Sequence, residues 1–206
     1  MKQRIKNYLL EQGISNICVD DILPKAQMLS IVFHQADINK VLLQKNFINQ
    51  TVIKSKNNED TQILARLYAL CDTVFSTINN RFLSLFSMKN EKITLLLQCG
   101  LTSQFTEMAI TEETAKQHLA ARAALSAWLQ CVDSSSDWVK SQELLSDFYP
   151  HNVQVFAIPI CSETGAVLGV LYGENNIDQP MDNEQFSWYI ALTITLMESM
   201  QNIQAA

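Results

Sequence analysis

The chain has 206 residues, 48% of them hydrophobic and 17% charged, which suits one ordinary domain with an appendage or two small domains. This composition argues against wholesale disorder, and the formal net charge of −6 argues against a surface built for nucleic acid. The first residues show no secretory signal, and no apolar run approaches the roughly 18 residues that span a bilayer. We therefore expect a cytoplasmic protein with no membrane partner.

The residue types that usually carry catalysis are scattered. The five cysteines are widely spaced without a CxxC pair, which favours reduced, mostly buried thiols over a disulfide framework or a zinc site. The three histidines show no HxxxH or HExxH spacing, and no GxSxG, GxxxxGKS or GxGxxG motif occurs. The sequence therefore predicts no catalytic residues, no metal site and no enzyme, and it leaves any cofactor unknown. A Cys-His couple of Cys131 with His118 or His151 stays open, because such pairs meet in space rather than in sequence.

Residues 1–59 are predicted to be a helical N-terminal segment. Apolar periodicity indicates short helices over 5–10, ending before Gly13, and over 38–48. Between them, Asp20 or Asp21 is expected to cap a helix that begins near Ile22. The simplest interpretation is a helical extension that packs on the main domain or on a second subunit.

A second interpretation of this segment is a helix-turn-helix. The spacing over 13–44 is faintly similar to the DNA-binding head of tetracycline-repressor-like proteins. Gln27 stands where that turn usually has Gly, Leu29 replaces a small polar residue, and the stretch LSIVFHQ has no Lys or Arg. Residues 1–60 hold eight basic and six acidic side chains, a net charge of only +2. Because phosphate contacts dominate DNA affinity, nucleic acid is not the expected partner.

The polar stretch 55–60 is the predicted domain boundary, so a second unit covers residues 60–206. Apolar residues recurring at helical spacing predict one long helix over 61–88, with Asp60 as its N-cap. Its apolar stripe is wide enough to cover a sheet and still offer surface to a partner.

The middle of the second unit alternates strands and helices. Thr111 is expected to cap a helix, although Thr114 stands where a full capping box has Glu or Gln. The predicted elements are strands at 92–99, 104–108 and 128–132, and helices at 111–127 and 138–148.

A hairpin followed by a helix closes the chain. VQVFAIPIC (153–161) and AVLGVLYGE (166–174) have the composition of strands, and the polar break between them ends in Gly165. Pro159 indicates an edge or bulged position, and Gly169 and Gly173 indicate close approach of another element. Residues 182–203 carry a helical pattern capped by Asp182.

This C-terminal part resembles the GAF family of small-molecule-sensing and regulatory domains. The resemblance rests on the strand ending in Pro-Ile, the short turn with Gly, VLGVLYGEN, and MDNEQFSWYIALTITLMESM, and it is strongest over residues 150–203. It implies an α/β (α+β) fold with a central antiparallel sheet of about six strands flanked by helices. It does not imply one ligand, because GAF domains bind very different molecules.

Known GAF activities find little support in the residues. The Asn-Lys-Phe-Asp-Glu signature of cyclic-nucleotide binding has only Asn175, Asn176, Asp182 and Glu184 as its nearest match, without the Lys and Phe. The clustered cysteines of free methionine sulfoxide reductases and the Cys-His pair for bilin attachment do not occur. In this family the region after the middle helix usually walls the pocket, and aromatic bodies with a few polar groups suit such a wall. The candidate ligand-binding residues are therefore Trp128, Cys131, Asp133, Trp138, Tyr149 and His151.

The sequence therefore predicts a regulatory or sensory protein in signal transduction that binds a small molecule or a protein partner. The helix 182–203 is apolar on more than one face, like 61–88, so we expect these helices to join a homodimer. The competing account is that residues 1–59 cover the same surface within one chain. The alternative functions are a one-component transcriptional regulator with a degenerate helix-turn-helix, or a ligand-free interaction and scaffold module.

Overall fold

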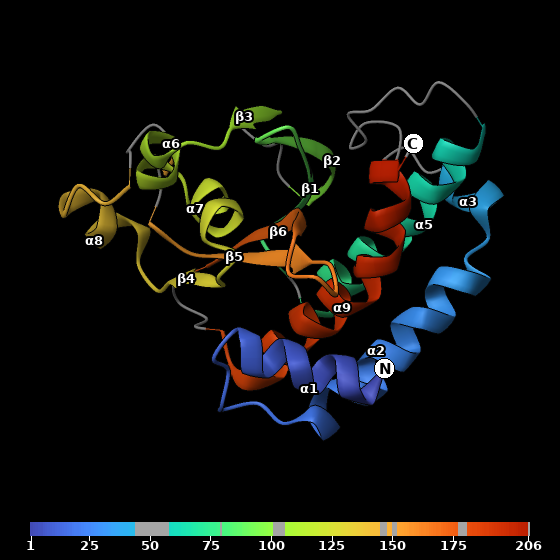
Figure 1. The fold of residues 1–206 in the computed structure, drawn as a ribbon. Coiled ribbons are helices and arrows are strands. Elements are labelled where there is room, and N and C mark those ends of the chain that lie inside the picture. The colour runs from blue at the N-terminus through green and yellow to red at the C-terminus, as the bar shows by residue number, and fades with distance from the viewer. Residues whose placement is uncertain are drawn as a thin grey trace.

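The described residues form a central sheet with a helical layer on each face (Figure 1). The computed structural model describes residues 1–43, 58–78, 80–100, 106–144, 148–149, 152–176 and 181–205. Its strands are β1 (Phe82–Lys89), β2 (Lys92–Gly100), β3 (Glu107–Ala109), β4 (Gln130–Val132), β5 (Val153–Cys161) and β6 (Val167–Asn176). They pair antiparallel in the order β3-β2-β1-β6-β5-β4, which confirms the expected fold class.

The two layers enclose two apolar clusters. The described helices are α1 (Lys2–Glu11), α2 (Val19–Gln35), α3 (Ile38–Leu43), α5 (Asn58–Ile78), α6 (Glu112–Gln117), α7 (Leu119–Ser126), α8 (Ser135–Lys140) and α9 (Asn183–Ala205). One face of the sheet packs against α5 and α9, with α2 on their outer side, and α1 lies beside α2 and contacts β5 through Tyr8. The opposite face packs against the alanine-rich α7, which lies beside α6 and α8. Burial on both faces explains why the central strands are apolar throughout.

The predicted hairpin is confirmed, with β5 and β6 paired antiparallel from Val153↔Asn176 onward. A Cβ on Gly169 would collide with the carbonyl oxygen of Phe86, and one on Gly173 would collide with the ring of Phe156, so the close approaches are also confirmed. β4 pairs with β5 only as far as Ala157, so Pro159 lies beyond its end, where no N–H is required. The carbonyl oxygen of Pro159 accepts a buried hydrogen bond of 2.9 Å from the hydroxyl of Tyr8 on α1.

The single helix predicted over 61–88 is wrong in its last third. α5 ends at Ile78, and the chain then forms strand β1 from Phe82. The first five residues of β1 are all buried, because helices cover both faces of the sheet. A strand buried on both sides shows no alternation, so its apolar residues continued the helical pattern by coincidence.

The helix predicted over 111–127 is two helices that meet at His118, whose extended φ of −138° ends α6 and begins α7. Thr111 caps α6 as expected. Thr114 also completes a reciprocal capping box, which the sequence analysis did not expect because Thr replaces the usual Glu or Gln. The helix predicted over 138–148 is found only at its start, because α8 spans Ser135–Lys140 and the chain turns at 141–144, while residues 145–147 lie outside the described part. β4 begins at Gln130, two residues later than predicted.

The strand predicted over 104–108 is found in part. β3 pairs with β2 from Glu107 to Ala109, and residues 104–105 lie outside the described part. Similarly, α3 accounts for the beginning of the helix predicted over 38–48, and the rest lies outside the described residues.

The N-terminal helices pack on the main sheet domain. α1 ends before Gly13 as predicted, whereas α2 begins at Val19, earlier than expected, with Cys18 as N-cap and Asp21 as the reciprocal partner. Gln27 lies within this uninterrupted helix, so the helix-turn-helix with its turn at 27–29 is wrong. The buried face of α2 carries Ile22, Ala26 and Leu29 and contacts α9 and α5. The division at residue 59 stays a prediction.

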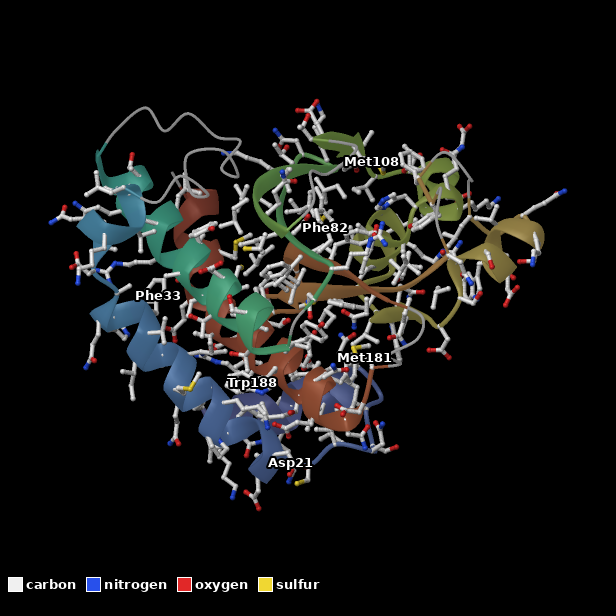
Figure 2. All side chains as sticks on the ribbon, turned by 180° about the vertical axis from the view of Figure 1, so that it is seen from behind. Asp21, Phe33, Phe82, Met108, Met181 and Trp188 are labelled. Atoms are coloured by element: carbon white, nitrogen blue, oxygen red, sulfur yellow. The ribbon has the colours of Figure 1, made fainter. Side chains whose placement is uncertain are left out.

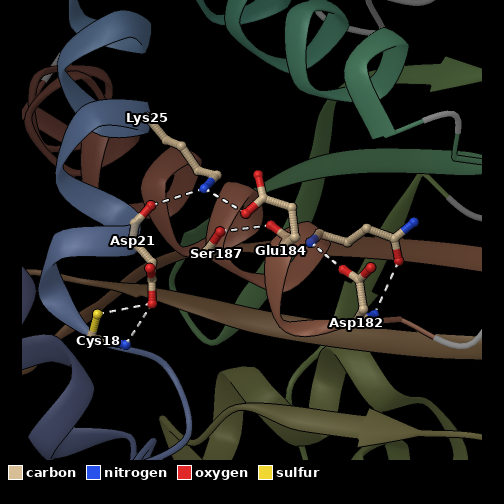
Figure 3. Close-up of polar contacts among 7 residues, drawn as sticks. Cys18, Asp21, Lys25, Asp182, Glu184 and Ser187 are labelled. Carbon is tan, nitrogen blue, oxygen red and sulfur yellow. Dashed lines mark hydrogen bonds and ion pairs between the residues drawn. The ribbon is translucent and has the colours of Figure 1, made fainter.

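An ion pair joins α2 to α9, and side-chain caps begin both helices (Figure 3). The ammonium of Lys25 donates to Glu184 at 3.0 Å and to the carbonyl of Asp21 at 2.9 Å, and it lies 5.6 Å from the ring centroid of Trp188. The carboxylate of Asp182 accepts from the backbone N–H of Gln185 at 2.7 Å, which confirms the predicted N-cap of α9.

The packing of α2 on α9 buries part of the helix that the sequence analysis assigned to a dimer interface. Ile194 and Leu196 of α9 are buried within one chain, between the sheet, α5 and α2. The alternative prediction is therefore correct for this surface: α2 of the N-terminal segment covers α9 within one chain. Whether the protein forms a dimer through another surface stays open to test.

Candidate ligand-binding site

A row of polar side chains crosses the sheet face that α7 covers. Gln98, Ser84 and Tyr172 lie opposite one another on β2, β1 and β6, and all three are buried. Residues directly opposite on neighbouring strands point to the same face of a sheet. Phe82 and Phe86, two positions to either side of Ser84, belong to the apolar cluster under α7, which fixes the side on which the row lies. Glu174 is paired with Phe82 and shares that face.

His118 and Tyr149 close over this row from the helical layer. The ring of His118 stacks on Tyr149 at 5.7 Å and lies 5.2 Å from the ring of Tyr172, with Phe148 edge-on at 5.0 Å. The Nδ1 of His118 accepts from the N–H of Ala120 at 3.1 Å. These contacts define the α7-face polar cluster, which consists of Ser84, Gln98, His118, Tyr149, Tyr172 and Glu174.

Two tyrosine hydroxyls tie the cluster together. The Tyr149 oxygen accepts from the backbone N–H of Leu119 at 3.0 Å, which anchors it to the first turn of α7. The Tyr172 hydroxyl donates to the Glu174 carboxylate at 3.2 Å. Burial raises the pKa of both phenols well above their ordinary value, so both remain protonated. Burial also lowers the pKa of His118 to about 3, so its imidazole is neutral at pH 7.

Ser84 is the member of the polar cluster whose side chain lacks a hydrogen-bond partner among the described residues. Its hydroxyl is fully buried in the middle of the row and has no hydrogen-bond partner among the described residues. A buried hydroxyl without a partner costs about 1–3 kcal/mol, so native proteins seldom retain one without a reason. A ligand that supplies a donor or acceptor at this point would offset that cost.

The predicted site residues separate into two places. Tyr149 belongs to the polar cluster. Half-buried Trp138 packs against the apolar cluster beneath α7, and its ring centroid lies 5.4 Å from the guanidinium of Arg122. Cys131 and Asp133 are exposed on and just after the edge strand β4, where Asp133 accepts from Gln154 at 3.0 Å.

Trp128 and His151 complete the predicted set. Trp128 is 55% exposed, and a Cβ on Gly13 would lie 3.6 Å from its ring. His151 lies outside the described residues. The role of all six residues in binding stays a prediction.

Sequence reasoning missed five of the six members of the cluster as binding residues. Ser84 was assigned to a helix, and Gln98, Tyr172 and Glu174 were treated only as parts of apolar strands. His118 was considered only as the partner of Cys131 in a Cys-His couple. The available signal was an isolated polar residue within an otherwise apolar strand, as in FLSLF and TLLLQC. Such a residue is a candidate for a buried polar site when both faces of the strand are covered.

Comparison with solved structures identifies the architecture. The GAF domain of an Acinetobacter phosphoenolpyruvate-protein phosphotransferase matches with a TM-score of 0.58 and 11% identity, over 89% of this chain and 95% of that one. A putative GAF sensor protein from Burkholderia vietnamiensis matches with a TM-score of 0.58 and 12% identity, over 88% and 99%. The chain has a GAF-like fold.

Solved GAF-like structures include enzymes as well as sensors. A free methionine-R-sulfoxide reductase from Neisseria meningitidis, in complex with its substrate, matches with a TM-score of 0.52 and 12% identity, over 87% of this chain and 93% of that one. No family model and no curated protein matches the sequence significantly. At this level of identity the GAF-like fold alone does not indicate an activity. The function must therefore be argued from the residues of the site.

The described part of this GAF-like domain contains neither a metal-binding cluster nor a membrane-spanning helix. No group of three or more His, Cys, Asp or Glu side chains gathers within the described part as a metal site would require. None of the described helices has both the length and the hydropathy of a membrane-spanning segment.

Proposed function

We propose that this GAF-like domain is a sensory or regulatory module that binds a small molecule at the α7-face polar cluster. The observation that carries the proposal is the fully buried hydroxyl of Ser84, which lacks a partner among the described residues. The surrounding cluster supports it, because Tyr149, Tyr172 and neutral His118 offer ring faces and hydrogen-bonding groups together. Apolar walls with a few convergent polar groups are what small-molecule sites contain.

The chemistry of the cluster indicates the kind of ligand. His118 stacks face to face with Tyr149 and at a tilt to Tyr172, so a planar ligand would find aromatic partners. Glu174 supplies an acceptor, and Ser84 supplies either a donor or an acceptor. A small planar molecule with at least one hydrogen-bond donor meets these requirements.

We further propose that the module acts by binding rather than by catalysis. Three of its thiols are buried, and burial raises the pKa of Cys71 and Cys99 well above the ordinary value and that of Cys161 to about 11. Thiols that keep their proton at pH 7 are poor nucleophiles. We therefore do not expect Cys71, Cys99 and Cys161 to carry out the reaction of the methionine-R-sulfoxide reductase of similar fold.

A thermal-shift screen of metabolites against the full chain tests the proposal. A ligand that binds only the folded state raises the melting temperature in proportion to the logarithm of its concentration. One strong stabiliser would support the sensor. The absence of any stabiliser, together with capture of a defined protein partner, would favour the ligand-free interaction module instead.

We expect Ser84→Ala to weaken binding of that stabiliser about five- to tenfold, the equivalent of one hydrogen bond. The same substitution should leave the free energy of unfolding of the unliganded protein unchanged or raise it by about 1 kcal/mol, because it removes a buried hydroxyl without a partner. Isothermal titration calorimetry and urea denaturation measure the two effects.

Ser135→Ala is the matched control. Ser135 is equally buried, but its hydroxyl accepts from the N–H of Val153 at 3.0 Å. Its replacement strands that donor and should lower the free energy of unfolding by about 1–3 kcal/mol. If Ser84→Ala destabilises the unliganded protein as much as Ser135→Ala does, Ser84 is a structural residue and the site is misassigned.

We also propose that the domain forms a homodimer and that ligand binding is transmitted to it. A ligand under α7 borders the sheet whose opposite face carries α5 and α9, so small changes in the sheet reach the helical layer. Because Ile194 and Leu196 are buried within the chain, the proposed shared surface does not include these two residues.

A further inference from the structure

A second group of buried polar side chains lies on the opposite face of the sheet, where β1 begins and β6 ends. Asn80 comes just before β1 and Asn175 is near the end of β6, with only 7% and 6% of their surfaces exposed. The hydroxyl of Tyr189 on α9 joins them, because it lies 2.6 Å from the Oδ1 atom of Asn80 and 3.4 Å from that of Asn175. Both side-chain amides therefore face α9, across the sheet from the α7-face polar cluster.

The amide nitrogens of both asparagines lack a partner. Burial raises the pKa of the Tyr189 phenol well above its ordinary value, so the hydroxyl keeps its proton and donates it. A distance of 2.6 Å suits an O–H···O bond and is shorter than an ordinary N–H···O bond, so the oxygen of Asn80 faces the phenol and its nitrogen points elsewhere. That nitrogen and the amide nitrogen of Asn175 have no hydrogen-bond partner among the described residues. Native proteins seldom keep buried N–H groups unpaired, so two beside one hydroxyl are suited to bind an acceptor.

Arg81 adds a third donor and a positive charge. It follows Asn80 in the chain, and its backbone N–H donates to the carbonyl of Glu174 at 3.2 Å, which places it beside the end of β6. The Nε atom of Arg81 is also buried and has no partner in the described part of the chain. We call Asn80, Arg81, Asn175 and Tyr189 the α9-face polar cluster. Its three unpaired atoms are all N–H donors.

Gln154 links this cluster to the surface of the protein. It lies opposite Asn175 on β5, and its amide nitrogen donates to the carboxylate of Asp133 at 3.0 Å. Its amide oxygen accepts from the backbone N–H of Met181 at 2.8 Å, and Figure 2 shows Met181 just before α9. Both ends of this amide are therefore bonded, unlike those of its neighbours. Because Asp133 is exposed, the chain of polar groups reaches water beside β4.

We propose that the α9-face polar cluster is a second small-molecule site, which binds a carboxylate group. An ionised carboxylate only accepts hydrogen bonds, and its two oxygens match a cluster whose unpaired atoms only donate. The guanidinium of Arg81 offsets its charge, and the carboxylate of Asp133 is exposed to water that screens it. A neutral carboxamide would bring N–H donors of its own, for which these atoms offer no acceptor. This site is separate from the α7-face polar cluster and does not depend on the proposed function.

Titration of the full chain with sodium acetate, followed by nuclear magnetic resonance of the side-chain amides, tests the site. We expect the signals of Asn80 and Asn175 to shift together and to saturate, in the millimolar range because so small a ligand makes few contacts. Sodium chloride at equal ionic strength and acetamide are the comparison probes, and neither should give a saturating shift. Acetate should also raise the melting temperature relative to chloride, because it binds only the folded state.

Asn175→Leu removes one of the unpaired amides and keeps the number of side-chain heavy atoms. We expect it to weaken acetate binding, measured at Asn80, about tenfold or more, which is the loss of one hydrogen bond to a charged group. The variant should remain folded, because its only described hydrogen bond is the long one to Tyr189. Ser84→Ala is the matched control, since Ser84 is also buried and unpaired but faces α7, and it should bind acetate as the wild type does.

Four results would overturn the proposal: no saturating shift of either amide, an equal response to chloride or acetamide, unchanged acetate binding in Asn175→Leu, or loss of acetate binding in Ser84→Ala. The last result would mean that acetate binds beneath α7 instead. If Asn175→Leu does not fold, the titration of the wild type with its two comparison probes decides alone. A failure here leaves the metabolite screen of the α7-face polar cluster untouched, because the two sites lie on opposite faces of the sheet.

Discussion

Replacing Gly169 by Ala is expected to lower the free energy of unfolding by about 3 kcal/mol or more, or to prevent folding. Gly169 lies in β6 opposite Ser87 of β1, at the centre of the sheet. A Cβ there would collide with the carbonyl oxygen of Phe86, and it would also meet the Met200 side chain of α9 at 2.6 Å. The methionine can rotate, but the Phe86 carbonyl belongs to a strand paired on both sides and cannot move without breaking the sheet.

Gly165→Ala separates this close approach from the general effect of losing a glycine. Gly165 lies in the hairpin turn with a φ of +83°, and a Cβ there would meet nothing within 4 Å. Only the strain of the left-handed conformation remains, about 1–2 kcal/mol. Urea denaturation of the two variants measures the difference. Equal losses would mean that β1 and β6 are not packed as tightly as the structure shows.

The same hairpin shows what the sequence could predict. Its strands are rich in β-branched and aromatic residues, a polar turn with Gly separates them, and Pro159 requires an edge. These signals are local in the sequence, so they can be recognised without knowing the rest of the fold. The helix 183–205 was similarly predictable, because Asp182 and a helical pattern lie next to each other in the chain.

β1 shows what the sequence concealed. Its identity depends on α5 and α9 covering one face and α7 the other, which is a fact about distant segments. The polar residues at 79–81 were the only local sign that the helix ends before Phe82. Because β1 was missed, the row through Ser84 could not be recognised, and the predicted site moved toward the exposed edge near Cys131.

The surface of α9 shows a third limit. Its apolar residues on several faces correctly indicated that more than the sheet must cover it. The sequence could not decide between a second subunit and the chain's own N-terminus. In the structure α2 covers it, so the chain's own N-terminal segment takes the place that a second subunit could have filled.

Because His118 is buried as a neutral imidazole, we expect the free energy of unfolding to fall steeply in mild acid. Its pKa in the folded protein is lowered to about 3 by burial, against an ordinary value near 6.5 in the unfolded chain. Above pH 6.5 both states hold a neutral imidazole, so the group does not affect the equilibrium. As the pH falls, only the unfolded chain binds the proton, and the free energy of unfolding falls by about 1.4 kcal/mol per pH unit. Between about pH 7.5 and pH 5 the loss from this group amounts to about 2 kcal/mol.

His118→Asn isolates this contribution, because Asn is also a good N-cap and can accept from the N–H of Ala120 without titrating. Its basal stability will differ, since it loses the stacking on Tyr149, so the comparison is between slopes. Urea denaturation at several pH values above 5, where few carboxylates titrate, should give the wild type the steeper decline by about 2 kcal/mol over that range. Nuclear magnetic resonance of the imidazole should show no titration of His118 in the folded protein there. Equal slopes, or a normal titration, would mean that water reaches this ring and that the cluster beneath α7 is open rather than closed.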